Sequence, residues 1–219
     1  MDCPDGDRTL RKVLIVGASR AGRAWAARWR SNGFTGEITI LDPDPDAPYD
    51  RPPLSKDMLK QEHPPITTPP GWWTTECEVL RGRARSLDAR NLSLDMVDPQ
   101  GCARRVSGDA IVLACGARPR TLPDMPEGVH VLRSWADARN LRQALDAGAR
   151  RAAVIGAGVL GCEMASSLRD RGIDVTLLDM APLPLARLLG DGLGRLARDW
   201  ISDAGVHLRL GCSKIEVSS

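Results

Sequence analysis

Two stretches of this sequence share one pattern, and that pattern decides the fold. The more complete copy is RAAVIGAGVLGCEMASSLRDRGIDVTLLD, residues 151–179, and the earlier copy is KVLIVGASRAGRAWAARWRSNGFTGEITILD, residues 12–42. Each begins with a short aliphatic run, typical of a strand buried on both faces. A glycine-rich turn, a helical stretch and a second apolar run ending on aspartate follow. Each copy is therefore predicted to be a βαβ unit.

The glycines of such a turn have separate tasks in a dinucleotide-binding unit. The first permits the tight turn, the second lets the backbone approach a pyrophosphate, and the third lets the helix pack close to the strand. The amides and the dipole at the helix N-terminus then meet the phosphates. In the second copy these glycines are Gly156, Gly158 and Gly161. The alternative reading is a glycine-rich turn in some other α/β domain.

The first copy keeps Gly17 and Gly22 but has Ser19 at the middle position. A side chain there makes close approach of a phosphate harder, although a serine hydroxyl can itself donate to phosphate. The whole copy nevertheless stays in register with the second, because glycines 17, 22 and 33 recur at the same spacing as glycines 156, 161 and 172. The repetition favours the same use for both turns.

The aspartate that closes each unit, Asp42 or Asp179, lies close to the distance of about 20 residues after the motif at which an acid binds the adenosine ribose. A carboxylate on the ribose diol favours NADH and repels the 2′-phosphate of NADPH. Arg187 is the only nearby cation that could reverse this preference. The alternative is that Asp179 merely ends a strand.

Composition excludes several classes of function. The 219 residues are 42% hydrophobic and 26% charged, with a net charge of +2, which argues against nucleic-acid and anionic-membrane partners. No secretory signal and no apolar run of membrane-spanning length stands out. The six cysteines are scattered and only three histidines occur, so no metal site is predicted. The reducing cytoplasm is the expected compartment.

The segments between the two copies predict the remaining organisation. Residues 43–60 are proline-rich and enter a short helix. The prolines stiffen the segment, which suits the positioning of a side chain against a planar cofactor. The alternative is a crossover loop that carries a solvated lysine. Residues 79–97 predict a strand hairpin, and residues 109–116 a buried strand. Helices are expected from Trp135 to Leu145 and over 190–204, and a final strand over 206–210. The predicted domains are residues 1–122 and 123–219.

At this point the sequence resembles a known family, the FAD-dependent pyridine-nucleotide oxidoreductases of the NADH-dependent ferredoxin or rubredoxin reductase type. The matching segments span residues 12–212 in family order: VLIVGASRAG, APYDRPPLSKDML, IVLACGARPRTLP, GVHVLRSWADARNLRQAL, AAVIGAGVLGCEMASSL and VTLLD. The resemblance implies an α/β fold with two three-layered, Rossmann-like domains built on parallel sheets. FAD is expected on residues 1–122 and NAD(H) on residues 123–219, and the family's C-terminal interface domain is expected to be absent.

The resemblance also implies roles for particular residues. Those assigned to the FAD pyrophosphate are Gly17, Ser19, Ala21 and Gly22. Asp42 would bind the adenosine ribose of FAD, although the family often carries this acid one residue later, where Pro43 stands. Lys56 would lie beside the reactive N5 of the flavin, where a cation stabilises the reduced ring. Ala84 and Arg133 match further FAD-contacting positions.

For NADH, the implied residues are Gly156, Gly158, Gly161 and Asp179. Glu163 would lie near the nicotinamide, within reach of Lys56. A disulfide reductase of this fold would need a pair of close cysteines against the flavin, and residues 43–76 contain no cysteine. The expected acceptor is therefore a two-iron ferredoxin or rubredoxin that serves an oxygenase. Two alternatives stay open: a non-catalytic nucleotide-binding remnant, or half of a split flavoprotein with a complementing or self-associating chain.

Overall fold

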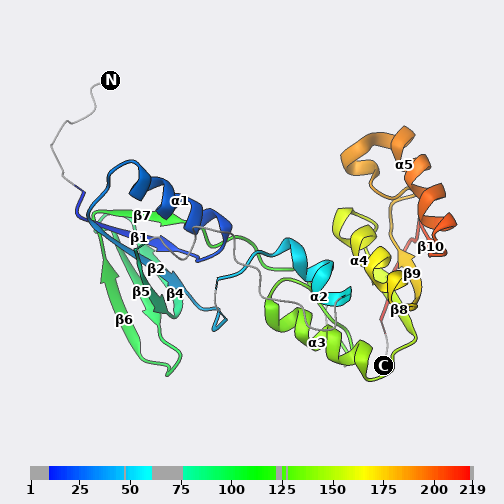
Figure 1. Cartoon of the computed structure of the whole chain (residues 1–219), viewed down its shortest axis with the longest axis horizontal. Coiled ribbons are helices and arrows are strands. Elements are labelled where there is room, and N and C mark those ends of the chain that lie inside the picture. The colour runs from blue at the N-terminus through cyan, green and yellow to red at the C-terminus, as the bar shows by residue number, and fades with distance from the viewer. Residues whose placement is uncertain (1–9, 47, 61–75, 122–124, 127, 218–219) are drawn as a thin grey trace. The chain divides into compact units, whose positions relative to one another are not determined.

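The computed structural model describes residues 10–46, 48–60, 76–121, 125–126 and 128–217. These residues form two compact units (Figure 1). The first unit contains the described residues up to 50 and those from 76 to 117. The second contains residues 51–60 and those from 118 onward. The proline-rich segment after Asp50 thus packs with the second unit.

A four-stranded parallel sheet forms the middle of the first unit. Its strand order is β3 (Glu78–Arg81), β2 (Glu37–Asp42), β1 (Lys12–Val16) and β7 (Ala110–Leu113). Because β1 pairs on both sides and is covered on both faces, residues 13–16 are all apolar and all buried. The predicted βαβ unit is confirmed, and so is a strand before Gly116. The prediction that this strand is buried is wrong, because β7 lies at the edge of the sheet and its residues are half-buried or exposed.

Two further layers cover this sheet. Helix α1 (Arg20–Ser31) covers one face, where Ala26 packs with Val13 and Ile15. An antiparallel sheet covers the other face, where Leu94 packs with Leu14 and Val16 from the same β1 strand (Figure 1). That sheet has the strand order β4 (Arg83–Asp88), β5 (Ser93–Val97) and β6 (Ala103–Ser107).

The hairpin predicted within residues 79–97 is confirmed by the antiparallel pairing of β4 with β5. Two differences accompany it. The first residues of that range belong to β3, which joins the parallel sheet beside β2. Strand β6 adds a third member to the hairpin through its pairing with β5. The hairpin is thereby part of a complete layer, because its apolar face covers the parallel sheet.

The second unit is built on a three-stranded parallel sheet of β10 (His207–Arg209), β9 (Asp174–Leu178) and β8 (Arg151–Ile155). Helix α4 (Val159–Asp170) packs against β8 and β9. The core joins Val175 and Leu177 of β9 to Leu168 of α4 and Leu145 of α3 (Trp135–Asp146). The last helix, α5 (Ala186–Asp203), begins before the predicted residue 190 and is broken at Gly190, where φ is 76°.

Residues 51–60 form a short turn of 3₁₀-helix, η1 (Pro52–Ser55), followed by the one-turn helix α2 (Asp57–Lys60). A helix this short has little stability by itself. The second unit stabilises it in two ways. Leu59 is fully buried in the core of that unit. The carbonyls of Met58 and Leu59 accept hydrogen bonds from Arg142 at 3.1 Å and Arg171 at 2.6 Å.

Across the described part of the chain, no helix combines the length and apolar character needed to cross a membrane. Among the same residues, no cluster of three or more His, Cys, Asp or Glu side chains is arranged to hold a metal ion.

Candidate nucleotide-binding sites

The two glycine turns have the same backbone conformation. Gly17 has φ 111° and Gly156 has φ 109°, a region that L-amino acids other than glycine rarely adopt. The N–H of each first glycine donates to a carbonyl of the strand that follows the helix. The distances are 2.8 Å from Gly17 to Leu41 and 2.7 Å from Gly156 to Leu178. The sequence repeat is therefore a repeat of geometry.

The middle position explains why a serine is tolerated in the first turn. Ser19 has φ −80° and ψ −170°, and Gly158 has φ −80° and ψ −174°. This is extended backbone that any residue adopts. Each residue is the N-cap of its helix, and each carbonyl accepts an N–H at 3.0 Å, from Arg23 or Cys162. The serine therefore leaves the turn unchanged.

The third glycine fixes how closely the helix approaches the turn. A Cβ added to Gly22 would lie 2.0 Å from the carbonyl oxygen of Gly17. A Cβ added to Gly161 would lie 1.7 Å from the carbonyl oxygen of Gly156. Both helices thus begin in contact with their turns, which brings their N-terminal amides to the carboxyl edge of the parallel strands.

Asp179 directly follows β9 and holds the second turn through both carboxylate oxygens. Its Oδ2 accepts the N–H of Ala157 at 2.6 Å, and its Oδ1 accepts the N–H of Ala181 at 2.8 Å. Asp179 is half-buried, and its side chain lines the space in front of the turn. The carboxylate is therefore fixed where a ribose bound to this turn would lie.

Asp42 repeats this arrangement in the first unit. Its Oδ2 accepts the N–H of Ala18, and its Oδ1 accepts the N–H of Asp44 at 2.8 Å. The Asp44 carboxylate in turn accepts the hydroxyl of the buried Tyr49 at 2.8 Å. Asp42 itself is buried at the end of β2. The acid at this position, one residue before Pro43, thus meets the glycine turn as Asp179 does.

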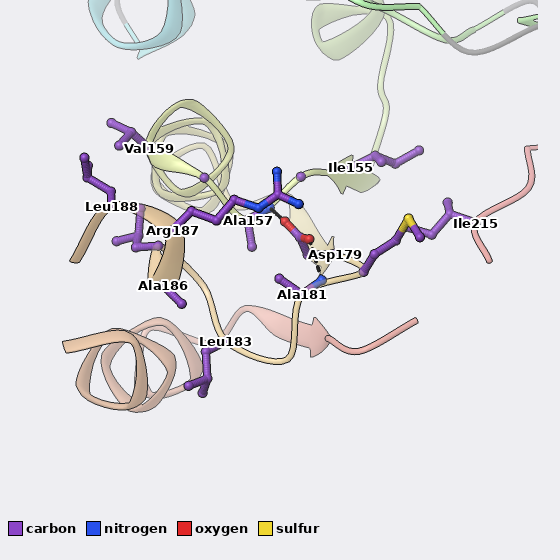
Figure 2. Close-up of a pocket in the computed structure, with 14 residues that line it drawn as sticks. Ile155, Ala157, Val159, Asp179, Ala181, Leu183, Ala186, Arg187, Leu188 and Ile215 are labelled. Carbon is purple, nitrogen blue, oxygen red and sulfur yellow. Dashed lines mark hydrogen bonds between the residues drawn. The ribbon is translucent and has the colours of Figure 1, made fainter. Parts of the chain in front are cut away.

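A pocket of about 400 Å³ lies in front of the second turn (Figure 2). A Cβ added to Gly156 or to Gly158 would meet nothing within 4 Å, so the backbone of the turn faces open space. The walls come from the turn, the residues after β9 and the start of α5. Such a cradle, with free access to backbone and a fixed carboxylate, fits the pyrophosphate and ribose of a dinucleotide.

Cys162, in the first turn of α4, is not an activated thiol. Burial raises its pKa, and the carboxylate of Asp179 raises it further. The side chain is half-buried, with its sulfur 3.6 Å from the carbonyl oxygen of Ala157. A nucleophilic cysteine needs a lowered pKa. The residue therefore packs the turn.

Lys56 and Glu163, predicted as a pair, lie together in the second unit. The ammonium of Lys56 is 3.1 Å from Oε2 of Glu163. Ser55, which no sequence pattern marks as a site residue, is buried and donates its hydroxyl to Oε1 of the same carboxylate. The Lys56 side chain stays about half exposed. Glu163 is thus held from the η1 turn while Lys56 keeps access to solvent.

The other predicted FAD-contacting residues lie in separate parts of the chain. Arg133 lies in the second unit, just before α3, and its carbonyl accepts a hydrogen bond from Arg51 at 3.2 Å. Ala84 lies in the first unit, on β4 opposite Met96. Ala21 is exposed in the first turn of α1. Their contacts with a flavin remain predictions.

The layers, strand orders and paired turns define a protein of two consecutive Rossmann-type units. Comparison with known proteins agrees. Residues 11–219 match the family model described as pyridine nucleotide-disulphide oxidoreductase. The chain belongs to this family.

Among curated relatives, the chlorobenzene dioxygenase ferredoxin reductase component of Cupriavidus sp. (strain PS12) is 36% identical, over 91% of this chain and 49% of the relative. The ferredoxin–NAD(+) reductase component of the p-cumate 2,3-dioxygenase system of Pseudomonas putida is 34% identical, over 95% and 52%. The chain spans about half the length of the curated relatives it matches.

Solved structures of reductases are also similar to this chain. The ferredoxin reductase for the CYP199A2 system of Rhodopseudomonas palustris matches with a TM-score of 0.84 and 31% identity, over 95% of this chain and 52% of that one. Putidaredoxin reductase, in its covalent complex with putidaredoxin, matches with a TM-score of 0.79 and 28% identity over the same shares.

Proposed function

We propose that this chain carries the two nucleotide sites of an FAD-dependent NADH:ferredoxin or rubredoxin oxidoreductase. The observation that carries the proposal is the duplicated turn. Each copy has a glycine in the left-handed region, a helix packed onto it and a strand-end aspartate bonded to its amide. Two dinucleotide sites in one chain suit a protein that takes hydride from one nucleotide and passes it to another.

In this proposal the first turn binds FAD. Gly17, Ser19, Ala21 and Gly22 supply the backbone that faces the pyrophosphate, and the α1 dipole favours the negative charge. Because Ser19 has the backbone angles of Gly158, the backbone of the first turn keeps the shape of the second. The Asp42 carboxylate holds the adenosine ribose. FAD, when bound, supplies the chemistry that accepts a hydride and releases single electrons.

The second turn binds NADH. Gly156 and Gly158 leave the space that the pyrophosphate needs, and Gly161 sets the close approach of α4. Asp179 accepts the hydroxyls of the adenosine ribose. The apolar walls of the pocket orient the nucleotide.

Lys56 and Glu163 act on charge beside the flavin ring. The carboxylate of Glu163, fixed by the Ser55 hydroxyl, holds the Lys56 ammonium in one place. A fixed cation favours negative charge that develops nearby, and it costs little reorganisation because it is already positioned. Lys56 is thus the residue that stabilises the reduced ring, and Glu163 is the residue that positions it.

The acceptor we propose is a two-iron ferredoxin or rubredoxin, which in turn supplies an oxygenase. The names of the two curated relatives described above, both ferredoxin reductase components of dioxygenase systems, support this class of partner. The sequence adds support, because residues 43–76 contain no cysteine pair that would direct electrons to a disulfide.

The test is NADH-dependent reduction of a two-iron ferredoxin by the FAD-loaded chain, followed by the visible absorbance of the ferredoxin. We expect reduction of ferredoxin and none of a small disulfide. A chain that holds FAD and is reduced by NADH, yet passes no electrons to the iron–sulfur protein, would contradict the proposed acceptor. A chain that takes up no FAD would favour a non-catalytic role or completion by another chain.

Asp179→Ala provides a matched pair with Asp174→Ala. Asp174 begins the same strand, pairs with Arg169 and lies outside the pocket residues. We expect the Asp179 variant to lose affinity for NADH by about tenfold, because a charged hydrogen-bond acceptor is lost. The Asp174 variant should keep the affinity of the unchanged chain.

A further inference from the structure

We infer that the open edge of β8 and the uncovered face of the second sheet form a docking site for a further polypeptide segment, which pairs a strand with β8 and covers that face. The two units share one strand order up to this edge. The first sheet has the order β3, β2, β1, β7, and the second has the order β10, β9, β8. Among the described residues, the second sheet therefore lacks a counterpart of β7.

In the first unit, β7 pairs with the backbone groups that β1 directs away from β2. The N–H of Gly17 donates to the carbonyl of Leu41, after the end of β1, so the N–H groups of Leu14 and Val16 point to the other side. On that side β7 lies parallel to β1, and the carbonyl of Val16 accepts the N–H of Ala114 at 2.8 Å.

The same backbone groups of β8 face an open edge. Gly156 donates to the strand β9 as Gly17 donates to β2, so the N–H groups of Ala153 and Ile155 point away from β9. Of the described strands, only β9 pairs with β8. A Cβ on Gly17 would lie 2.3 Å from the carbonyl oxygen of Ala114, beyond β7, whereas a Cβ on Gly156 would meet nothing within 4 Å. An open edge of this kind accepts a further strand.

The face of the sheet gives a second, independent comparison. In the first unit, the antiparallel sheet covers this face through Leu94 and Met96. These two side chains pack with Leu14, Val16 and Leu41 in one buried cluster. The three residues of the parallel sheet are thereby removed from solvent.

Their counterparts in the second unit are not covered. Ile155 is 44% exposed, whereas Val16 at the same position of the repeat is 7% exposed. Ala153 is exposed and Leu178 is half-buried. The opposite face of the same sheet packs against α4, and Val175 there is fully buried. One face of the second sheet is thus finished and the other presents apolar side chains to solvent.

The occupant that fits both the edge and the face is a segment with the plan of residues 83–113. In that range three antiparallel strands are followed by a strand that joins the parallel sheet. The relatives have the length for such a segment, because this chain spans about half of theirs. The segment therefore comes from the half of a reductase chain that this chain does not span. Burial of the apolar face favours its docking, and strand pairing with β8 fixes its register.

The test co-expresses the whole chain, tagged, with the half of the Cupriavidus reductase component that it does not match. Hydrogen–deuterium exchange then compares the purified complex with the chain alone, and neither FAD nor NADH is added. We expect the two polypeptides to co-purify. The amides of Ala153 and Ile155 should exchange at least about tenfold more slowly in the complex. The amides of Leu14 and Val16, which already face β7, should exchange equally slowly in both samples.

Two variants locate the contact. Ala153→Asp places a charge on the uncovered face and should reduce co-purification at least about tenfold. Leu193→Asp is the matched control, because Leu193 is 52% exposed on α5 and lies outside the sheet. It should co-purify as the unchanged chain does. Both side chains are exposed, so neither substitution should unfold the chain.

Three results would overturn the inference. The first is that the two polypeptides do not co-purify, or that they co-purify while the β8 amides exchange as fast as before. The second is that Leu193→Asp prevents co-purification and Ala153→Asp does not, which would place the partner on α5. The third is that the chain alone is a dimer with slow exchange at Ala153 and Ile155, because a second copy would then occupy the edge.

Discussion

At the scale of single residues, Gly17 meets two demands at once. Its φ of 111° excludes other residue types, and an added Cβ would lie 2.3 Å from the carbonyl oxygen of Ala114. Gly33, which follows α1, shares the positive φ, at 88°, but a Cβ there would meet nothing within 4 Å. The pair therefore separates the cost of backbone strain from the cost of a steric clash.

We expect Gly33→Ala to lower the free energy of unfolding by about 1–2 kcal/mol, the cost of a left-handed residue with a Cβ. Gly17→Ala should cost about 1–3 kcal/mol more, because the backbone around Ala114 must also move. Urea unfolding followed by tryptophan fluorescence measures both, since Trp25 and Trp29 stack at the core of the first unit. Equal losses for the two variants would show that the turn relaxes around the new methyl group.

Lys56 and Lys60 form a second matched pair, because both lie in the segment 51–60 and both have a carboxylate partner. Lys56 pairs with Glu163 at 3.1 Å, and Lys60 pairs with Asp170 at 2.5 Å. In the FAD-loaded chain, Lys56→Ala should slow reduction of the flavin by NADH about tenfold and shift the visible flavin spectrum. Lys60→Ala should change neither. If the two variants behave alike in stopped-flow absorbance, Lys56 is only a surface residue.

At the scale of elements, the attachment of α2 to the second unit depends on Leu59. Its side chain is fully buried among Leu168, Val175 and their neighbours. Leu59→Ala should lower the free energy of unfolding by about 2–5 kcal/mol, because the substitution leaves a cavity in the core and the neighbouring side chains lose their contacts with Leu59. Leu160→Ala, on the exposed face of α4, should stay within about 0.5 kcal/mol of the unchanged chain. A neutral Leu59→Ala in urea unfolding would mean that the segment does not depend on this core.

The antiparallel sheet carries a pH-dependent element. The guanidinium of Arg105, with the hydroxyl of Ser86, lowers the pKa of Asp95 from 3.8 to about 2. The contacts are 2.7 Å from Arg105 Nε and 2.7 Å from Ser86 Oγ. Because the folded pKa is lowered, this contribution to stability is present at neutral pH and is lost as the pH falls from near 4 to about 2.

Arg105→Leu should therefore raise the pKa of Asp95 toward 3.8, as measured by NMR titration of its carboxyl carbon. Arg104→Leu is the control, because Arg104 lies next on the same strand but pairs with Asp98 at 3.1 Å. An Asp95 titration that is unchanged in the Arg105 variant would show that this ion pair does not persist in solution.

Elements with a local cause could be predicted from the sequence. The βαβ units follow from apolar runs and glycine spacing, and the structure has them where they were expected. The expectation that the first strand of each unit is buried on both faces holds for β1 but is wrong for β8, which lies at the edge of its sheet with half-buried and exposed residues. The α2 segment, by contrast, depends on Leu59, Arg142 and Arg171, which meet only in the folded unit. Strand β6 carries little apolar pattern, since four of its five residues are exposed, and only pairing with β5 defines it.

The same division applies to the candidate sites. The glycine and aspartate positions could be predicted from the sequence, because the geometric reason for each lies within one βαβ unit. Ser55 was missed because its partner, Glu163, lies 108 residues later in the sequence. The place of Arg187 in the pocket depends on Leu185, whose φ of 58° no sequence pattern indicates.

At the scale of the whole molecule, one chain carries two glycine turns of the same geometry, for which we propose different nucleotides. The conformations at Gly17 and Gly156 agree within a few degrees, and the aspartate bonds repeat in both units. The family model matches residues 11–219 and so covers both units, and the chain spans about half the length of the curated relatives it matches. The proposed assignment of FAD to the first turn and NADH to the second is what an experiment must decide.

The most direct measurement is the visible absorbance of the chain after incubation with FAD and removal of unbound flavin, before and after anaerobic addition of NADH. We expect flavin bands that stay with the protein and are bleached by NADH. A protein that retains no flavin would overturn the proposed FAD site, and one whose flavin bands persist in the presence of NADH would overturn the proposed transfer of hydride between the two nucleotides.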